Sequence, residues 1–289
     1  MGNLYLEARL DALRRTQNPD GGWGYFSGKQ SWLEPTAYAA LALHGEDSAD
    51  RAWKLLRSWQ NANGSWRPST DVQIESWGTS LCVTIAAARG EYGEPFQKGV
   101  AWLLATEGIE ANALARLAAK VGLFKPDRNL SYRGWPWKPN TSSWVEPTSH
   151  ALVALKQSAP KIADRRLNNR LLLGHSQLLD VRCRDGGWNY GSRAALEVDL
   201  PSYPETTGIA LVGLQHHAAV ADSVELAARM ARENVSPLAR VWLTMALKLH
   251  DREAPEPEGE VTADLLLTAL EALSCAHYTL FKTGGEIGT

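Results

Sequence analysis

The chain has 289 residues, of which 44% are hydrophobic and 21% charged, and its formal net charge is −2. This composition is typical of a globular protein with a sizeable core, and the lack of a basic excess argues against nucleic acid as a main partner. Three scattered cysteines, Cys82, Cys183 and Cys275, predict reduced thiols in a cytoplasmic protein rather than a disulfide framework. We expect no signal peptide, because no basic stretch precedes an apolar stretch near Met1. No apolar run is long enough to cross a bilayer, so we also expect no transmembrane segment.

Two kinds of helix alternate along the sequence. The first kind is amphipathic, with Lys and Arg on one face, which is typical of helices on the outside of a protein. Candidates for these outer helices are residues 4–15, 49–59, 97–104, 165–179 and 223–232. The second kind is apolar on nearly every face, which predicts burial on all sides. Candidates for these inner helices are residues 36–43, 149–155, 207–214 and 263–273.

Outer and inner helices that alternate about six times close into an α/α toroid, with the inner helices in a ring and the outer helices around them. We therefore predict an all-α protein with one (α/α)6 toroid domain over residues 1–289. Sustained alternation of apolar and polar residues is missing, so we predict no sizeable sheet. Two longer polar stretches, residues 125–143 and 252–259, are either plain connections or lips that close over a cavity.

A short phrase recurs where the inner helices are expected to begin. It consists of Glu, any residue, usually Thr, and a small residue. Full copies start at Glu34, Glu146, Glu205 and Glu260, and looser copies start at Glu75 and Glu110. Self-similarity at intervals of tens of residues indicates a repeat architecture. An acid in the first turn also complements the helix dipole.

The loops between outer and inner helices share a second phrase, Gln-x-x-x-Gly-Gly/Ser-Trp. Copies span residues 17–23 and 60–66, then 182–188 with Arg182 in place of Gln, and a worn copy spans 133–137. Asn-Gly or Asp-Gly supplies the positive φ of a tight turn after a helix. We expect the Trp to fill the gap between neighbouring outer helices.

These loop phrases resemble the QW repeat of squalene-hopene and oxidosqualene cyclases, and are similar to the repeats of protein prenyltransferase β-subunits. The resemblance covers most of the chain. It implies an α/α barrel whose central cavity is lined by inner-helix residues. It does not by itself imply a reaction, because one fold supports many functions.

The chain departs from both enzyme groups at the residues that do their chemistry. The cyclases protonate an alkene with an Asp-x-Asp-Asp-Thr-Ala motif at the start of an inner helix. At the matching places this chain keeps Thr36-Ala37 and Thr148-Ser149 but only one carboxylate each, Glu34 and Glu146. The prenyltransferases bind Zn through an Asp-x-Cys pair, which this sequence lacks. We therefore expect no metal and no other cofactor.

Candidate catalytic residues are Glu146, His150, Glu34 and Glu205. If the inner helices begin at one mouth of the toroid, their acids form a partial ring, and like charges there raise one another's pKa. Glu146 is the favoured acid because His150 lies four residues on, on the same helix face, and the cyclases similarly pair their acid with a His. The alternative is that each Glu only complements a helix dipole. A metal site at His216-His217 is not favoured, because adjacent helix residues point in different directions.

Candidate substrate-binding residues are the aromatics Trp32, Trp77, Trp144, Tyr203 and Tyr38. Three of them stand two residues before a repeated Glu, and Trp77 belongs to a looser copy of the phrase. Aromatic faces stabilise cations. The alternative is that these rings pack the loops onto the barrel.

Three functions stay open at this point. The first is a terpenoid-cyclase-like protein that binds a polyprenyl or other apolar chain and uses Glu-based acid chemistry for cyclisation or isomerisation. The second is a non-catalytic toroid that binds a lipid, a peptide or a partner protein as an accessory in a biosynthetic pathway. The third is a carbohydrate-active enzyme, because α/α toroids also host glycan hydrolases and lyases with Trp platforms and acidic pairs.

Overall fold

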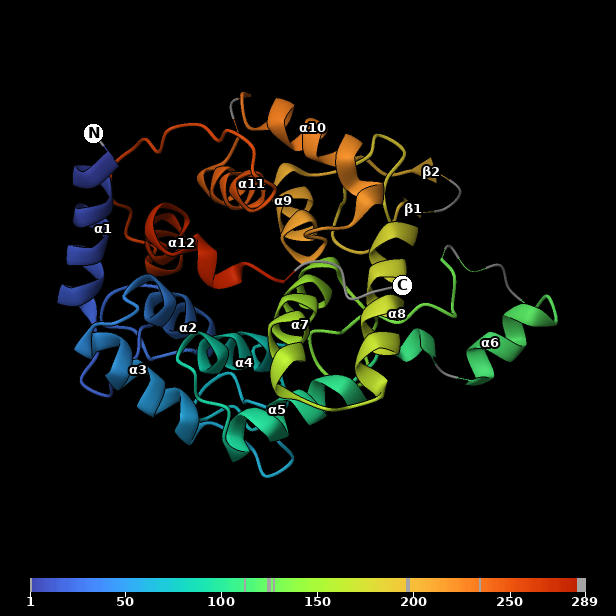
Figure 1. Cartoon of the computed structure of the whole chain (residues 1–289), viewed down its shortest axis with the longest axis horizontal. Helices are drawn as coiled ribbons and strands as arrows, with labels where there is room; N and C mark the ends of the chain where they lie inside the picture. Colours follow the sequence, from blue (N-terminus) through green and yellow to red (C-terminus); the bar gives the residue numbers. More distant parts are fainter. Residues whose placement is uncertain are drawn as a thin grey trace.

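Six apolar helices form a closed ring around a common axis in the computed structural model, which describes residues 2–111, 113–123, 126, 128–195, 198–233 and 235–284. Neighbours in the ring follow the chain order, and the last inner helix packs on the first (Figure 1). The inner helices are α2 (Leu33–Ala42), α4 (Thr79–Ala88), α7 (Val145–Ser158), α9 (Pro204–Gly213), α11 (Pro237–Leu249) and α12 (Leu265–Ala276). The predicted all-α toroid is confirmed.

The outer layer consists of amphipathic helices that each cover the space between two inner helices. They are α1 (Gly2–Thr16), α3 (Asp47–Ser58), α5 (Glu94–Ala105), α8 (Arg166–Asp180) and α10 (Ala221–Met230). Helix α1 packs on α12, so the two ends of the chain close the ring. Helix α6 (Ala113–Lys120) projects away from the ring beyond α8 (Figure 1). The remaining elements are η1 (Ile109–Ala111), η2 (Ala159–Lys161), η3 (Ala218–Val220), η4 (Tyr278–Phe281) and the antiparallel strands β1 (Ala194–Ala195) and β2 (Val198–Asp199).

The last third of the ring differs from the sequence prediction. Helix α11 carries no Glu phrase and was not predicted; its signal is Ser236, which caps the helix by accepting a hydrogen bond from Ala239 N at 3.2 Å, followed by Pro237. The phrase at Glu260 does not open the next inner helix. Glu260 lies exposed in the connection, and α12 begins five residues after it at Leu265, capped by Asp264.

A tryptophan–threonine contact repeats in four of the loops and fixes each inner helix to the outer helix before it. In each case the Trp main-chain N–H donates to a Thr hydroxyl on the inner helix, while the indole N–H donates to a carbonyl near the end of an outer helix. The pairs are Trp23–Thr36, Trp66–Thr79, Trp135–Thr148 and Trp188–Thr207, with N···O distances of 2.9, 2.9, 2.9 and 3.0 Å. The indole acceptors are Leu13, Leu56, Leu103 and Leu178, at 2.7–2.9 Å. All four Trp side chains are buried.

The Gln of the loop phrase ties each loop to the next outer helix. Gln17 Nε2 donates to Ser48 O in α3 at 2.8 Å, and Gln60 Nε2 donates to Pro95 O in α5 at 2.8 Å. Gly64, at φ +95°, is required in its turn, because a Cβ there would lie 2.3 Å from the carbonyl oxygen of Lys98. The worn loop at residues 133–137 lacks the Gln, and Arg170 of α8 replaces it by bonding Gly134 O at 2.8 Å.

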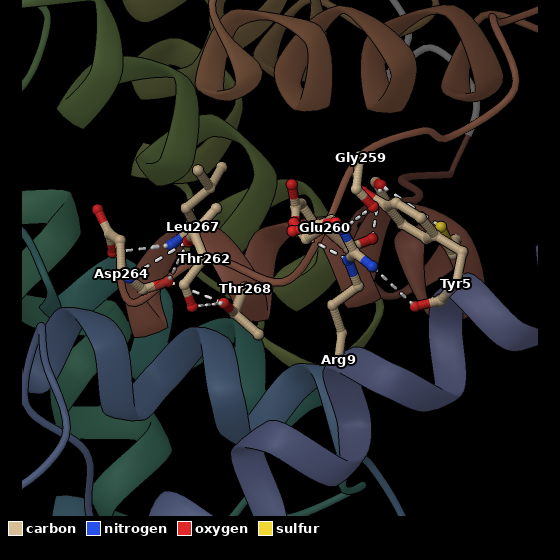
Figure 2. Close-up of polar contacts among 11 residues, drawn as sticks. Tyr5, Arg9, Gly259, Glu260, Thr262, Asp264, Leu267 and Thr268 are labelled. Atoms are coloured by element: carbon tan, nitrogen blue, oxygen red, sulfur yellow. Dashed lines mark hydrogen bonds and ion pairs between the residues drawn. The ribbon is translucent and has the colours of Figure 1, made fainter.

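A buried ion pair joins the first and last helices. Arg9 of α1 donates to Glu271 of α12 at 2.9 Å, with side-chain exposures of 2% and 6%. The same guanidinium donates to the carbonyl oxygens of Gly259 and Glu260 at 3.0 Å each, and lies over the ring of Tyr5 (Figure 2). Arg9 therefore holds α1, α12 and the connection before α12 together.

One buried amide lies unpaired beside the worn loop. Gln177 of α8 is 2% exposed, and neither of its side-chain polar atoms has a hydrogen-bond partner. Its place beside Gly134 matches that of Leu55 of α3 beside Gly22 in the first loop. We expect Gln177→Leu to raise the free energy of unfolding by about 1 kcal/mol, because it removes an unsatisfied polar group from the core. Urea unfolding measures this, and a lower stability of the variant would show that the amide has a partner such as a buried water.

Candidate functional site

Three repeated glutamates gather at the end of the ring where the inner helices begin. Glu34, Glu146 and Glu205 occupy the first turns of α2, α7 and α9. They are close enough that the charges of Glu34 and Glu205 both act on Glu146. The expected convergence of these acids on one mouth is therefore what the structure shows. Asp264, the capping residue of α12, is a fourth acid near Glu34.

Burial raises the pKa of all three carboxyl groups. Burial is the main cause that raises the pKa of Glu146 well above its ordinary 4.5, and the charges of Glu34 and Glu205 add to it. Burial likewise raises the pKa of Glu34 and of Glu205. Glu34 differs in accepting a hydrogen bond from the Tyr25 hydroxyl at 2.6 Å, which favours its ionised form. Each of the three side chains keeps some solvent exposure.

An aromatic layer lies beneath the acids. His150 is one turn along α7 from Glu146, but its hydrogen bond goes to the Tyr38 hydroxyl, at 3.1 Å from Nε2. The His150 ring also contacts Trp77, Trp242 and Phe281, with centroid distances of 5.3, 5.5 and 5.8 Å. Burial lowers the pKa of His150 to about 3, so the ring is neutral at physiological pH. Among the residues described, no hydrogen bond joins Glu146 to His150, so the two do not form the predicted acid pair directly.

The predicted aromatics divide into a rim and a buried layer. Trp32, Trp144 and Tyr203 are the residues that precede α2, α7 and α9, in the places where capping side chains usually stand. Trp144 and Tyr203 are 38% and 45% exposed, so they form part of the rim. Tyr38 is fully buried, and Trp77 reaches between the two levels with partial exposure.

The sequence interpretation missed three aromatic residues of the rim. Tyr25, Trp137 and Tyr190 each follow the Trp of a loop phrase by two residues. The carbonyl oxygen of each accepts a main-chain N–H at or near the start of the neighbouring inner helix on one side of the ring. Tyr25 accepts from Leu265 at 2.9 Å, Trp137 from Trp77 at 3.0 Å, and Tyr190 from Val145 at 3.0 Å. Tyr25 bonds Glu34, Trp137 contacts Trp77 at 5.1 Å, and Tyr190 contacts Tyr203 at 5.5 Å. The signal that could have found them is this fixed spacing from the loop Trp.

The looser copies of the Glu phrase have other roles. In the other repeats the Glu lies two residues before the Thr of the tryptophan–threonine contact. In this repeat that Thr is Thr79, so Trp77 and not Glu75 occupies the position of the Glu. Glu75 instead accepts from the Trp102 indole at 2.7 Å. Glu110 is buried in η1 and accepts from Ser143 N at 3.0 Å, so it opens no inner helix; Asn112 of that copy lies outside the residues described.

Within the residues that the structure describes, no group of three or more His, Cys, Asp or Glu side chains could hold a metal ion. His216 bonds Thr283 O at 3.0 Å, whereas the His217 ring faces His175, so the adjacent pair points to different partners.

No helix among the residues that the structure describes is long and apolar enough to cross a membrane. The polar stretch 125–143, a candidate lip of the cavity, includes residues 125 and 127, which are not among the residues that the structure describes.

The raised pKa of Glu146 predicts a specific dependence of stability on pH. Such a glutamate stabilises the folded state fully below its unfolded pKa of about 4.5, and this stabilisation is lost as the pH rises through the folded pKa. We expect Glu146→Gln to reduce the fall in unfolding free energy as the pH rises above about 4.5. Urea unfolding at a series of pH values measures this. Glu94→Gln is a matched control in the first turn of α5, because the Lys98 side chain lowers the pKa of Glu94. Equal slopes for Glu146→Gln and the wild type would contradict the prediction.

No family model matches the sequence, and no curated protein matches it. Several solved structures share the fold. The type II terpene cyclase MstE from Scytonema, in its apo form, is similar with a TM-score of 0.59 and 16% sequence identity, over 95% of this chain and 97% of that chain. Endoglucanase Cel10 from Klebsiella pneumoniae, a family 8 glycosyl hydrolase, is similar with a TM-score of 0.61 and 14% identity, over 93% of this chain and 98% of that chain.

An inactive variant of an α-1,6-mannanase from Salegentibacter is similar with a TM-score of 0.64 and 9% identity, over 97% of this chain and 100% of that chain. At these identities the likeness establishes the α/α toroid and leaves the activity open. Terpene cyclases and glycosidases are both represented among the similar structures.

Proposed function

We propose that the toroid binds an uncharged, isoprenoid-like chain at the acid-lined end of the ring, and that Glu146 donates a proton to it. The observation that carries this proposal is the position of Glu146: a carboxyl group whose pKa is raised by burial and by the charges of Glu34 and Glu205, one helical turn before His150 and its aromatic neighbours. A neutral carboxylic acid is a proton donor. The aromatic face of the partly exposed Trp77 would stabilise positive charge that develops on a substrate after protonation.

The acid layer also constrains which end of a chain can bind there. Glu34, whose ionised form the Tyr25 hydroxyl favours, disfavours an anionic diphosphate through like-charge repulsion, so the group that enters is uncharged. A donor with a raised pKa is a weak acid, and it transfers a proton more readily to an oxygen than to an isolated double bond. We therefore favour an apolar chain with an oxygenated end. A structure of an MstE variant holds geranylgeranyl dihydroxybenzoate, an apolar chain with an oxygenated end, as its substrate.

The proposed steps use two different carboxyl groups. The O–H bond of Glu146 breaks and its proton bonds either to an epoxide oxygen, whose C–O bond then opens to a hydroxyl on the same chain, or to an alkene carbon, whose π bond breaks. Either route leaves a cation on a carbon of the chain. Glu34, whose ionised form is favoured by the Tyr25 hydroxyl, then accepts a proton from the chain. One proton enters and one leaves, so the net reaction is a cyclisation or isomerisation that needs no cofactor.

A carbohydrate-active enzyme is the second candidate, favoured by the exposed rim. Trp144, Tyr190 and Tyr203 are 38%, 49% and 45% exposed beside Glu205, and such rings suit the flat face of a sugar. Glycosidases also need a neutral acid and a second carboxylate on opposite sides of the scissile bond. Glu146 and Glu205 would take these roles.

Calorimetric binding and product analysis distinguish the candidates. We would offer farnesol, geranylgeraniol and squalene in one series, and cello- and manno-oligosaccharides in another. The proposal expects an isoprenoid to bind and turn over. It further expects Glu146→Gln to lower turnover by about 10²–10⁴-fold with binding retained, and Glu94→Gln to behave as wild type.

Each other outcome selects a different function. Binding of sugars without isoprenoids favours the glycosidase. Binding of an isoprenoid with no product from the wild type favours a non-catalytic carrier. If neither series binds, the proposal is wrong.

A further inference from the structure

A cavity of about 410 Å³ lies at the end of the ring opposite the glutamates, where the inner helices end. Its walls come from the end of α4, the last turn of α7, the short helix η2 and the segment around η4. None of the glutamates at the mouth of the ring lines it. The cavity is therefore separate from the candidate site described above.

The cavity combines apolar walls with positive charge. Ala87 and Ala88 of α4 and Leu280 of η4 supply apolar surface. Two lysines also line it, the buried Lys156 and the exposed Lys282, and no Asp or Glu is among the described residues that do so. A ligand that matches this surface has a small apolar body and a negative charge that meets Lys282.

Lys156 is a buried amine that the proposed reaction at the mouth does not use. It lies in the last turn of α7 and is 8% exposed. Its Nζ donates to Gly213 O at 2.9 Å and to Gln215 O at 3.2 Å, at the end of α9. Burial lowers the pKa of Lys156 to about 8. At physiological pH a larger share of this amine than of a surface lysine is therefore in the neutral, nucleophilic form.

We propose that Lys156 forms an imine in this cavity with a small aldehyde that carries an anionic group. The apolar walls enclose the body of the aldehyde, and the ammonium group of Lys282 pairs with its negative charge. A desolvated lysine beside a second cationic group is an established arrangement for imine formation with carbonyl compounds. This second site does not depend on the activity proposed for the glutamates.

The proposed step is a condensation that needs no oxidant or reductant. The neutral Nζ attacks the carbonyl carbon, so that C–N bonds form as the C–O bonds break. The aldehyde oxygen leaves as water with both hydrogens of the amine. Once protonated, the imine has one N–H group, which can donate to Gly213 O or Gln215 O as the free amine does.

Trapping with pyridoxal 5′-phosphate and borohydride tests the proposal on the full chain. The probe is an aldehyde with a phosphate group, and borohydride reduces its imine to a stable secondary amine. Peptide mass spectrometry then identifies the labelled lysine. We expect Lys156 to be the main labelled residue of the wild type. Absence of label, or label on other lysines with Lys156 unmodified, overturns the proposal.

Lys156→Met should leave only the background labelling of surface lysines. Lys248→Met is the matched control and should label as wild type. Lys248 also lies in the last turn of an inner helix and donates to a carbonyl oxygen, Ser274 O at 2.8 Å, but it is less buried. Unchanged labelling of a folded Lys156→Met variant contradicts the proposal. If circular dichroism shows that this variant does not fold, the peptide map of the wild type decides.

A comparison of two probes tests the role of Lys282. Pyridoxal has the same aldehyde as pyridoxal 5′-phosphate but lacks the phosphate group. The wild type should therefore label more readily with pyridoxal 5′-phosphate, and Lys282→Met should lose most of that preference while Lys156 stays labelled. Equal labelling of Lys156 by both probes in the wild type would show that the cavity does not select an anionic aldehyde.

Discussion

Replacing Arg9 by Met should destabilise the protein by about 3–5 kcal/mol, because it leaves the Glu271 carboxylate buried without its partner. The pair is 2% and 6% exposed, so water cannot take the place of the guanidinium. The carbonyl oxygens of Gly259 and Glu260 lose the same donor (Figure 2). Urea unfolding followed by circular dichroism measures the loss.

The double variant Arg9→Met, Glu271→Leu separates burial of a lone charge from loss of the contact. It should recover most of the stability, since replacing a buried ion pair with apolar residues is often close to neutral. Lys98→Met, which breaks the exposed pair of Lys98 and Glu94 on α5, should change little. An equally large loss in the double variant would instead mean that the ion pair itself closes the ring.

Replacing Trp188 by Ala is expected to cost about 3–5 kcal/mol, the range for truncating a large buried aromatic. The side chain is fully buried, and its indole N–H donates to Leu178 O at 2.7 Å. The substitution therefore leaves both a cavity and an unpaired carbonyl between α8 and α9. Thermal and urea unfolding measure the effect.

Two further variants show which part of Trp188 matters. Trp188→Phe keeps most of the volume but loses the indole donor, so its stability should fall between those of Trp188→Ala and the wild type. Trp144→Ala removes the same type of residue at 38% exposure and should cost much less. If Trp188→Ala were no worse than Trp144→Ala, the loop tryptophans could not be what joins the two layers.

The ring could be predicted from the sequence because its inner helices are apolar on every face, which few other environments allow. The prediction of inner helices failed where the Glu-x-Thr phrase and the start of a helix did not coincide. Helix α11 has Ser236 and Pro237 where other repeats have Glu, and the phrase at Glu260 lies in an exposed connection that follows no loop Trp. A Glu-x-Thr pattern alone therefore does not distinguish a helix start from a loop.

The candidate site could be predicted only in part. The gathering of Glu34, Glu146 and Glu205 follows from helices that begin at the same end of a ring. The partner of His150 could not be predicted, because Tyr38 lies 112 residues away on another inner helix. Which of two neighbours a buried side chain bonds depends on packing across the axis, and periodicity along one helix carries no information about that.

The tryptophan–threonine contact has a consequence for protein engineering. It holds each helix start through a main-chain N–H and a hydroxyl, so the residue two places before the Thr is free to change. Three repeats have Glu there, and one has Trp. These positions stand at the starts of four inner helices. Single residues could be exchanged at them to introduce new chemistry, with the scaffold left intact.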